Sequence, residues 1–158
     1  MENTHKKFIK AAVKAALNGM DNNEGGPFGC VIVKDGKIIG SGNNKVTSTN
    51  DPTAHAEVTA IREACKNLKS FQLTGCIIYT SCEPCPMCLG AIYWARPDKV
   101  FYGSTKADAA KIGFDDAFIY KEIALDFDKR SIPFEQCARD IALEPFNKWE
   151  ALEDKTEY

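Results

Sequence analysis

The sequence predicts an α/β protein in which a central sheet is sandwiched between helices. Three observations lead to this fold class. The chain opens with a helical pattern of apolar residues, two short apolar segments then flank Asp35-Gly36, and a continuous apolar run at 76–80 lies between two further helical patterns. Because a hairpin pairs antiparallel strands and a crossover helix joins parallel ones, the expected sheet is mixed and begins with the hairpin.

The first elements are a helix and a hairpin. Apolar side chains recur at the spacing of an amphipathic helix over residues 8–20. Residues 30–33 and 37–39 are expected to form two antiparallel strands, because Asp-Gly between apolar segments is a strong signal for a two-residue hairpin turn.

A second helix is expected over residues 53–68. Asp51 would be its N-cap and Pro52 its first helical residue, which places His55 in the first turn. The run at 76–80 follows and has the continuous apolar character of a strand that is covered on both faces.

A third helix is expected after this strand, with Pro86 in its first turn, where proline is tolerated, and a break at Arg96-Pro97. Residues 99–102 then predict another strand. Weaker helical patterns cover the remainder of the chain, at 106–112, 116–125, 134–142 and the C-terminal end.

Length and composition indicate a single domain over 1–158. The chain is 44% hydrophobic and has no repeat, low-complexity stretch or linker. Its net charge is −2, and residues 121–158 hold 6 basic against 10 acidic residues. An acidic C-terminal segment argues against a nucleic-acid partner, which requires a basic face to neutralise phosphates.

The seven cysteines indicate thiols rather than disulfides. An odd count cannot pair completely, and the lysines near the start of the chain interrupt any signal-peptide core. No apolar run reaches the length of a membrane span. We therefore expect a cytoplasmic protein with no membrane association.

Three of the cysteines lie in the stretch SCEPCPMC, residues 81–88, at intervals of three. This spacing also begins a bacterial iron–sulfur motif, but the position of the next cysteine is Ile92. The cysteines outside this stretch have no ligand spacing and are expected to be small apolar residues, namely Cys30, Cys65, Cys76 and Cys137.

A zinc site explains the stretch better. The pattern H-x-E at 55–57 followed by P-C-x-x-C at 84–88 is the signature of zinc deaminases. His55, Cys85 and Cys88 would bind zinc and leave a fourth position for water, as in catalytic sites. The alternative is a closed structural site in which Cys82 is the fourth ligand.

Glu57 has a chemical role in the catalytic interpretation. Two thiolates and an imidazole cancel the formal charge of zinc, so the metal acidifies its water less than an all-histidine site would. A carboxylate beside the metal can accept that proton and deliver it to the substrate. The alternatives are an exposed first-turn glutamate that the helix dipole favours, and a non-enzymatic zinc-stabilised interaction module.

With these motifs the chain resembles the cytidine deaminase-like zinc hydrolases and, within them, the bacterial guanine deaminases. The resemblance is carried by GGPFGCVIVKDG, NDPTAHAEVTAIR, YTSCEPCPMCLGAIYWARP, GFDDAFIYKEI and the terminal KTEY. It implies a three-layer α/β/α fold, one Zn²⁺ per subunit, and hydrolysis of guanine to xanthine and ammonia by water activated at zinc. It also implies a homodimer in which residues from about 120 to 158 are exchanged between subunits.

The resemblance also implies roles for individual residues. His55, Cys85 and Cys88 resemble the zinc ligands, and Glu57 resembles the proton shuttle. The residues that resemble substrate-binding positions are Phe28 against the purine ring, Asn44 at its polar edge, Asp116 as acceptor for the ring N–H and the amino group, Trp94 as a secondary pocket residue, and Tyr158 closing the pocket.

Structural alternatives to these substrate roles remain open. Phe28 and Trp94 would equally serve in a core, Asn44 in a turn, and Asp116 as a helix N-cap. Among activities, deamination of guanosine, cytosine, another nucleoside or tRNA adenosine uses the same zinc chemistry in a reshaped pocket.

Overall fold

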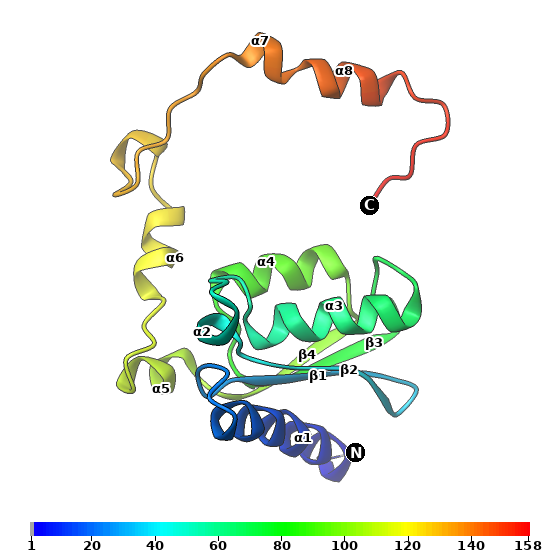
Figure 1. Cartoon of the computed structure of the whole chain (residues 1–158), viewed down its shortest axis with the longest axis vertical. Helices are drawn as coiled ribbons and strands as arrows, with labels where there is room; N and C mark the ends of the chain where they lie inside the picture. The colour runs from blue at the N-terminus through cyan, green and yellow to red at the C-terminus, as the bar shows by residue number, and fades with distance from the viewer. Residues whose placement is uncertain (1) are drawn as a thin grey trace. The chain divides into compact units, whose positions relative to one another are not determined.

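The computed structural model describes residues 2–158, which form two compact units (Figure 1). The first unit extends to Asp116 and contains all four strands and the first five helices. The second unit is Ala117–Tyr158 and is helical where it is regular. That residues 1–158 form a single domain stays a prediction.

The first unit is built on a mixed sheet with the strand order β2-β1-β3-β4. β1 is antiparallel to β2 and to β3, whereas β3 and β4 are parallel, so the expected fold class is confirmed. Asp35 and Gly36 adopt φ values of 49° and 73°, as a type I′ hairpin turn requires. The bounds are β1 (Gly29–Lys34), β2 (Lys37–Asn43), β3 (Cys76–Cys82) and β4 (Lys99–Ser104).

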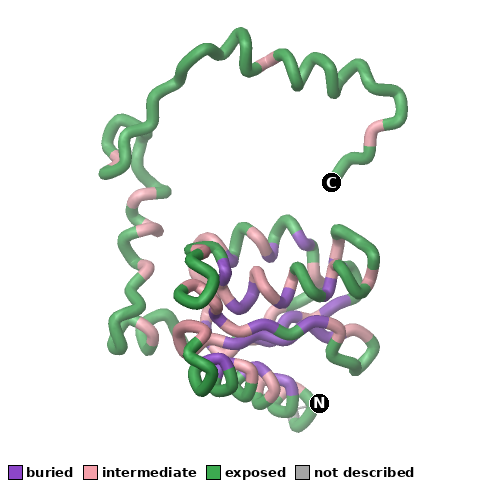
Figure 2. Tube along the Cα trace, in the orientation of Figure 1, coloured by how far each residue is buried: buried purple, intermediate pink, exposed green. Residues whose placement is uncertain are grey.

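Helices cover both faces of this sheet (Figure 1). α1 (Glu2–Asp21) packs on one face, where Phe8, Val31 and Tyr79 form part of one core cluster. α3 (Ala56–Leu68) and α4 (Pro86–Ala95) lie on the other face over a second cluster that includes Ile32. Alternate residues of β1 therefore point to opposite cores, and Figure 2 shows the buried residues concentrated in these layers.

Glycines let α3 lie close against β2. A Cβ at Gly42 would meet the carbonyl of Ala56 and, at 2.6 Å, the backbone nitrogen of Ala60. Gly40 is similarly close to the Ala60 carbonyl, at 2.6 Å. This close packing fixes the N-terminal end of α3 beside the end of β2, where the candidate site lies.

The predicted start of this helix at residue 53 is wrong. α3 begins at Ala56, and His55 is its N-cap in an extended conformation with φ −70° and ψ 158°. Asp51 does not cap the helix. Its carboxylate instead accepts hydrogen bonds from the backbone nitrogen and the hydroxyl of Thr53, at 2.8 and 2.6 Å, which hold the chain in a local turn.

Several other bounds differ from those expected. α1 begins well before residue 8, and a short helix, α2 (Val46–Thr49), was not predicted. The helix expected over 134–142 is wrong, because only its last residues are helical. The remaining elements are α5 (Lys106–Lys111), α6 (Ala117–Ile123), the 3-10 helix η1 (Phe127–Lys129), α7 (Arg139–Ala142) and α8 (Glu144–Glu150).

The second unit buries none of its described residues fully in this single chain (Figure 2). Its exposed side chains include many large apolar ones, namely Phe118, Ile123, Phe127, Ile132, Phe134, Ile141 and Phe146. Within residues 2–158, no helix is both long and apolar enough to cross a membrane.

Candidate active site

Two helix N-termini bring the predicted metal ligands together. His55 is the N-cap of α3, Cys85 is the N-cap of α4, and Cys88 lies in the first turn of α4. Pro86 occupies the start of α4, as the sequence predicted, where no intrahelical hydrogen bond is lost. The backbone N–H groups and positive dipole end of α4 favour negative charge on its two cysteines.

The geometry of this group fits zinc. The Nδ1 atom of His55 lies 3.5 Å from the sulfur of Cys85 and 3.5 Å from that of Cys88. Zn–N and Zn–S bonds of about 2.0 and 2.3 Å at a tetrahedral angle give an N···S separation of about 3.5 Å. All three ligand atoms lie within 4.8 Å of one another. The donor set therefore fits a tetrahedral ion, and Nδ1 is the imidazole nitrogen that faces it.

The pKa values of the two thiols shift in opposite directions. A hydrogen bond with Cys88 lowers the pKa of Cys85 to about 4, and His55 adds to this effect. The same bond, together with burial, raises the pKa of Cys88. To bind zinc, both sulfurs would have to be thiolates, because the thiolate is the metal-binding form.

Cys82 is excluded from the group. Among residues 2–158, the residues that come together as possible metal ligands are His55, Cys85 and Cys88. The sulfur of Cys82 lies 3.6 Å from the carbonyl oxygen of Thr105, and burial raises the pKa of its thiol. The closed zinc site and the iron–sulfur alternative both lack the extra cysteine that they need.

Glu57 lies buried against this group. Only 6% of the residue is exposed, which rules out an exposed first-turn glutamate. Its Oε1 accepts a hydrogen bond from the Thr80 hydroxyl at 2.9 Å, and its Oε2 accepts one from the Cys88 thiol at 3.3 Å. Burial raises the pKa of the Glu57 carboxyl, and the hydrogen bonds partly offset this. The carboxylate is therefore held beside the metal ligands, where it can exchange protons.

The extended N-cap explains how His55 and Glu57 reach the same site. Residues two apart point to different sides of a regular helix. His55 precedes the first helical residue and has extended dihedral angles. The direction of its side chain is therefore not set by the helical periodicity that applies to Glu57. The sequence did not predict the role of Thr80. A threonine in an apolar strand gives no indication of which side chain its hydroxyl will hydrogen-bond.

Two predicted substrate residues lie in adjoining loops of the first unit. Asn44 is buried, and its Oδ1 accepts hydrogen bonds from the backbone nitrogens of Gly26 at 3.3 Å and Val46 at 3.1 Å. The oxygen of the Asn44 amide is thus engaged by the backbone, and its contact with a substrate stays a prediction. Phe28 packs edge-to-face against Phe114, with ring centroids 4.9 Å apart.

The segment that contains Asp116 lies near the same site. Asp116 is partly buried and is the last residue before α6. Burial raises its pKa, and the negative charge of Cys85 acts in the same direction. Trp94 and Tyr158 are exposed, at 66% and 70%, and their substrate roles stay predictions.

A mixed sheet with helices on both faces, a His/Cys/Cys group and a buried glutamate beside it together define a zinc-dependent hydrolase of the deaminase type. The profile of the cytidine and deoxycytidylate deaminase zinc-binding region matches residues 2–104, and the chain belongs to this family. Membership of this deaminase family argues against the alternative of a purely structural zinc module.

The comparisons extend to nearly the whole chain. The chain is 60% identical over 154 residues to the guanine deaminase of Bacillus subtilis (strain 168), which covers 98% of this chain and 99% of that protein. The X-ray structure of guanine deaminase from Bacillus subtilis matches with a TM-score of 0.95 over 98% of each chain. The tRNA-specific adenosine deaminase of Buchnera aphidicola subsp. Schizaphis graminum is 37% identical over 82% of each chain.

Proposed function

We propose that this protein is a zinc-dependent guanine deaminase that hydrolyses guanine to xanthine and ammonia. The observation that carries the proposal is the buried Glu57 carboxylate, held by Thr80 beside a His/Cys/Cys group whose dimensions fit tetrahedral zinc. The 60% identity to a guanine deaminase over nearly the full chain supports this substrate.

Each site residue has a role in this reaction. His55, Cys85 and Cys88 would hold the zinc ion, which when bound would activate water as a nucleophile. Glu57 would transfer the two protons of that water in turn: one to a ring nitrogen as the oxygen bonds to the amino-bearing carbon, and one to the amino group as its bond to carbon breaks and ammonia departs. Thr80 keeps the carboxylate in position through both transfers.

Guanine recognition requires both donors and acceptors. Guanine presents a ring N–H beside the amino group that is removed, and the Asp116 carboxylate can accept from both. The Nδ2 of Asn44 donates to an acceptor on the opposite side of the base, while the ring of Phe28 packs on the purine. Adenine and cytosine lack that N–H next to the reacting amino group, so one carboxylate oxygen of Asp116 would have no hydrogen-bond donor on these bases.

The active assembly in this proposal is a homodimer that exchanges the segment from about residue 120 to 158, with one zinc ion per subunit. Support comes from the exposed apolar side chains of the second unit, which need a surface to cover them. Trp94 on α4 would belong to such a surface, and Tyr158 would close the pocket. Light scattering should give twice the mass of one chain.

The thiol ligands support the cytoplasm as the place of action, because a reducing compartment keeps cysteines available for metal. All seven cysteines are free thiols in the structure.

The function is tested by ammonia release from zinc-loaded protein with guanine, guanosine, adenine and cytosine offered separately. Glu57→Gln should retain zinc and lose about 10²- to 10⁴-fold in kcat. Glu63→Gln, on the exposed face of the same helix, is the matched control and should keep full activity.

Turnover of guanine alone supports the proposal. Turnover of guanosine, adenine or cytosine instead would keep the zinc chemistry and overturn the roles given to Asp116 and Tyr158. Equal properties of the Glu57→Gln and Glu63→Gln variants would overturn the enzymatic role of the carboxylate.

A further inference from the structure

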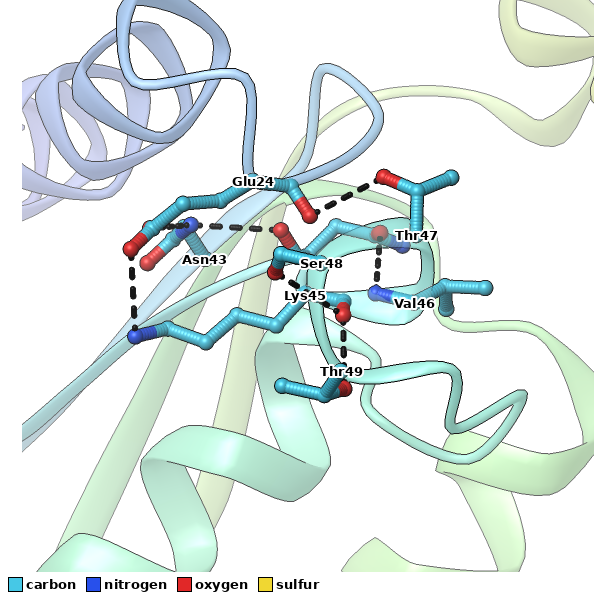
Figure 3. A network of polar contacts seen from close by, with 8 residues as sticks. Glu24, Asn43, Lys45, Val46, Thr47, Ser48 and Thr49 are labelled. Atoms are coloured by element: carbon cyan, nitrogen blue, oxygen red, sulfur yellow. Dashed lines mark hydrogen bonds and ion pairs between the residues drawn. The ribbon is translucent and has the colours of Figure 1, made fainter.

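The carboxylate of Glu24 lies between the two chain neighbours of Asn44 (Figure 3). Its Oε2 accepts a hydrogen bond from Asn43 Nδ2 at 2.7 Å, and its Oε1 lies 3.5 Å from Lys45 Nζ. The same Nδ2 of Asn43 also donates to the backbone carbonyl of Asn44 at 3.2 Å. One side-chain amide therefore links the Glu24 carboxylate directly to the Asn44 backbone.

The backbone of the Glu24 loop makes further contacts with the segment after Asn44. The carbonyl oxygen of Glu24 accepts hydrogen bonds from the Ser48 nitrogen and the Thr47 hydroxyl, both at 3.2 Å. Figure 3 shows the bond from the Thr47 hydroxyl, which joins the loop to α2. Gly25 lies so close that a Cβ there would meet Oδ1 and the backbone oxygen of Asn44. The two loops thus pack as one unit around this asparagine.

We propose that Glu24 is a positioning residue that fixes the orientation of the Asn44 side-chain amide for substrate binding. This inference rests on the proposed function, which gives Asn44 its substrate. With the backbone held through Asn43 and Oδ1 held by Gly26 and Val46, the amide plane has one orientation, and its Nδ2 donor is aimed before the ligand arrives. Such preorganisation saves the entropy of ordering that donor on binding.

The hydrogen bond through Asn43 is expected to matter more than the ion pair with Lys45. The side chains of Lys45 and Glu24 are 37% and 31% exposed, and an ion pair in contact with solvent is screened. The 2.7 Å bond from an amide to a carboxylate is short and charge-assisted. Glu24→Gln keeps an acceptor for Asn43, whereas Glu24→Ala removes both contacts, so the glutamine variant should rescue part of the loss.

A double-mutant cycle tests whether Glu24 acts through Asn44. In the otherwise wild-type protein, Glu24→Ala should raise the KM for guanine on the order of tenfold with little change in kcat, because a binding interaction is weakened. In an Asn44→Ala background the same substitution should change KM by less than about twofold. Zinc content should be unchanged in all four proteins, because Glu24 does not contact the metal ligands.

Glu63→Ala is the matched control. The Glu63 carboxylate accepts a hydrogen bond from the backbone of Ser41 at 2.6 Å, so this substitution also removes a carboxylate that binds β2. Its KM should stay at the wild-type value. An equal rise in KM for Glu24→Ala in both backgrounds, or a similar rise for Glu63→Ala, would show general loosening of the strand and overturn the proposal.

A second measurement does not depend on the substrate. The side-chain amide resonance of Asn44, identified by its loss in Asn44→Ala, should shift or broaden in Glu24→Ala and stay in place in Glu63→Ala. If the wild type fails to turn over guanine, the proposed function fails, but this resonance still decides whether Glu24 orients Asn44. An unmoved resonance in Glu24→Ala would overturn the inference even with a fully active enzyme.

Discussion

Thr80→Val isolates the hydrogen bond that holds Glu57. Valine has nearly the shape of threonine but has no hydroxyl, so the 2.9 Å bond to Oε1 is lost without a cavity. A hydrogen bond to a charged group contributes about 1.5–3 kcal/mol, and a buried partner that is left unpaired costs a comparable amount. We expect the free energy of unfolding to fall by about 2 kcal/mol, which lowers Tm by about 4–8 °C in a chain of this length.

The same change should reduce turnover more than binding. Without Thr80, the Glu57 carboxylate loses its hydroxyl donor, and the Cys88 thiol can no longer donate to it once Cys88 binds zinc as a thiolate, so the position of the carboxylate relative to the substrate loosens. A catalytic group displaced by about 1 Å costs up to about 10²-fold in rate, so we expect a 10- to 100-fold loss in kcat. Zinc should remain bound, because Thr80 contacts none of the three ligands in the structure.

The assay is steady-state ammonia release from guanine, accompanied by thermal unfolding and metal analysis of each variant. Thr80→Ser keeps the hydroxyl and should recover most of kcat, while Thr74→Val makes the same chemical change at an exposed site before β3 and should be neutral. If Thr80→Val lowers Tm but leaves kcat within about twofold, the carboxylate does not depend on this bond and the reasoning is refuted.

Three further predictions concern the metal and the segment after β4. Cys85→Ser should lose most bound zinc in emission spectrometry while Cys82→Ser retains it, and the reverse result would restore Cys82 as a ligand. Removing zinc with a chelator should abolish ammonia release and lower Tm, with both restored by zinc, because the ion joins the ends of α3 and α4. Thr105 hydrogen bonds in a capping box hold the pKa of Asp108 at about 2. This folded pKa lies below the unfolded value, so the capping box stabilises the fold at neutral pH and loses that effect as the pH falls. Thr105→Val should therefore lower the urea midpoint at neutral pH, and the difference from wild type should shrink from about pH 4 to pH 2. A difference in midpoint that stays constant with pH would contradict this prediction.

The local motifs were read correctly from the sequence because their geometry is local. Cys85 and Cys88 lie three residues apart at a helix start marked by Pro86, so their sulfurs converge whatever the rest of the fold does. The Asp35-Gly36 hairpin is local in the same sense, since two positive φ angles suffice to make the turn.

Errors arose where two local structures compete. An aspartate such as Asp51 can serve equally well as a helix N-cap or as the acceptor in a local turn, and the sequence pattern was interpreted as an N-cap. In the folded chain its carboxylate binds Thr53, so α3 starts later and His55 becomes the cap residue. The helix expected over 134–142 failed for another reason, because its apolar residues find no core within the single chain.

By itself, the sequence determined the α/β class, the mixed sheet with its hairpin, and the members of the His/Cys/Cys group that could hold a metal, because each rests on short spacings along the chain. The tertiary structure alone decided that Cys82 lies outside the metal group and that Glu57 is held by Thr80. These contacts join residues more than 20 positions apart, Glu57 on α3 to Thr80 on β3 and Cys82 on β3 to Thr105 after β4. They depend on how α3 and β4 are placed against β3, which no local pattern encodes.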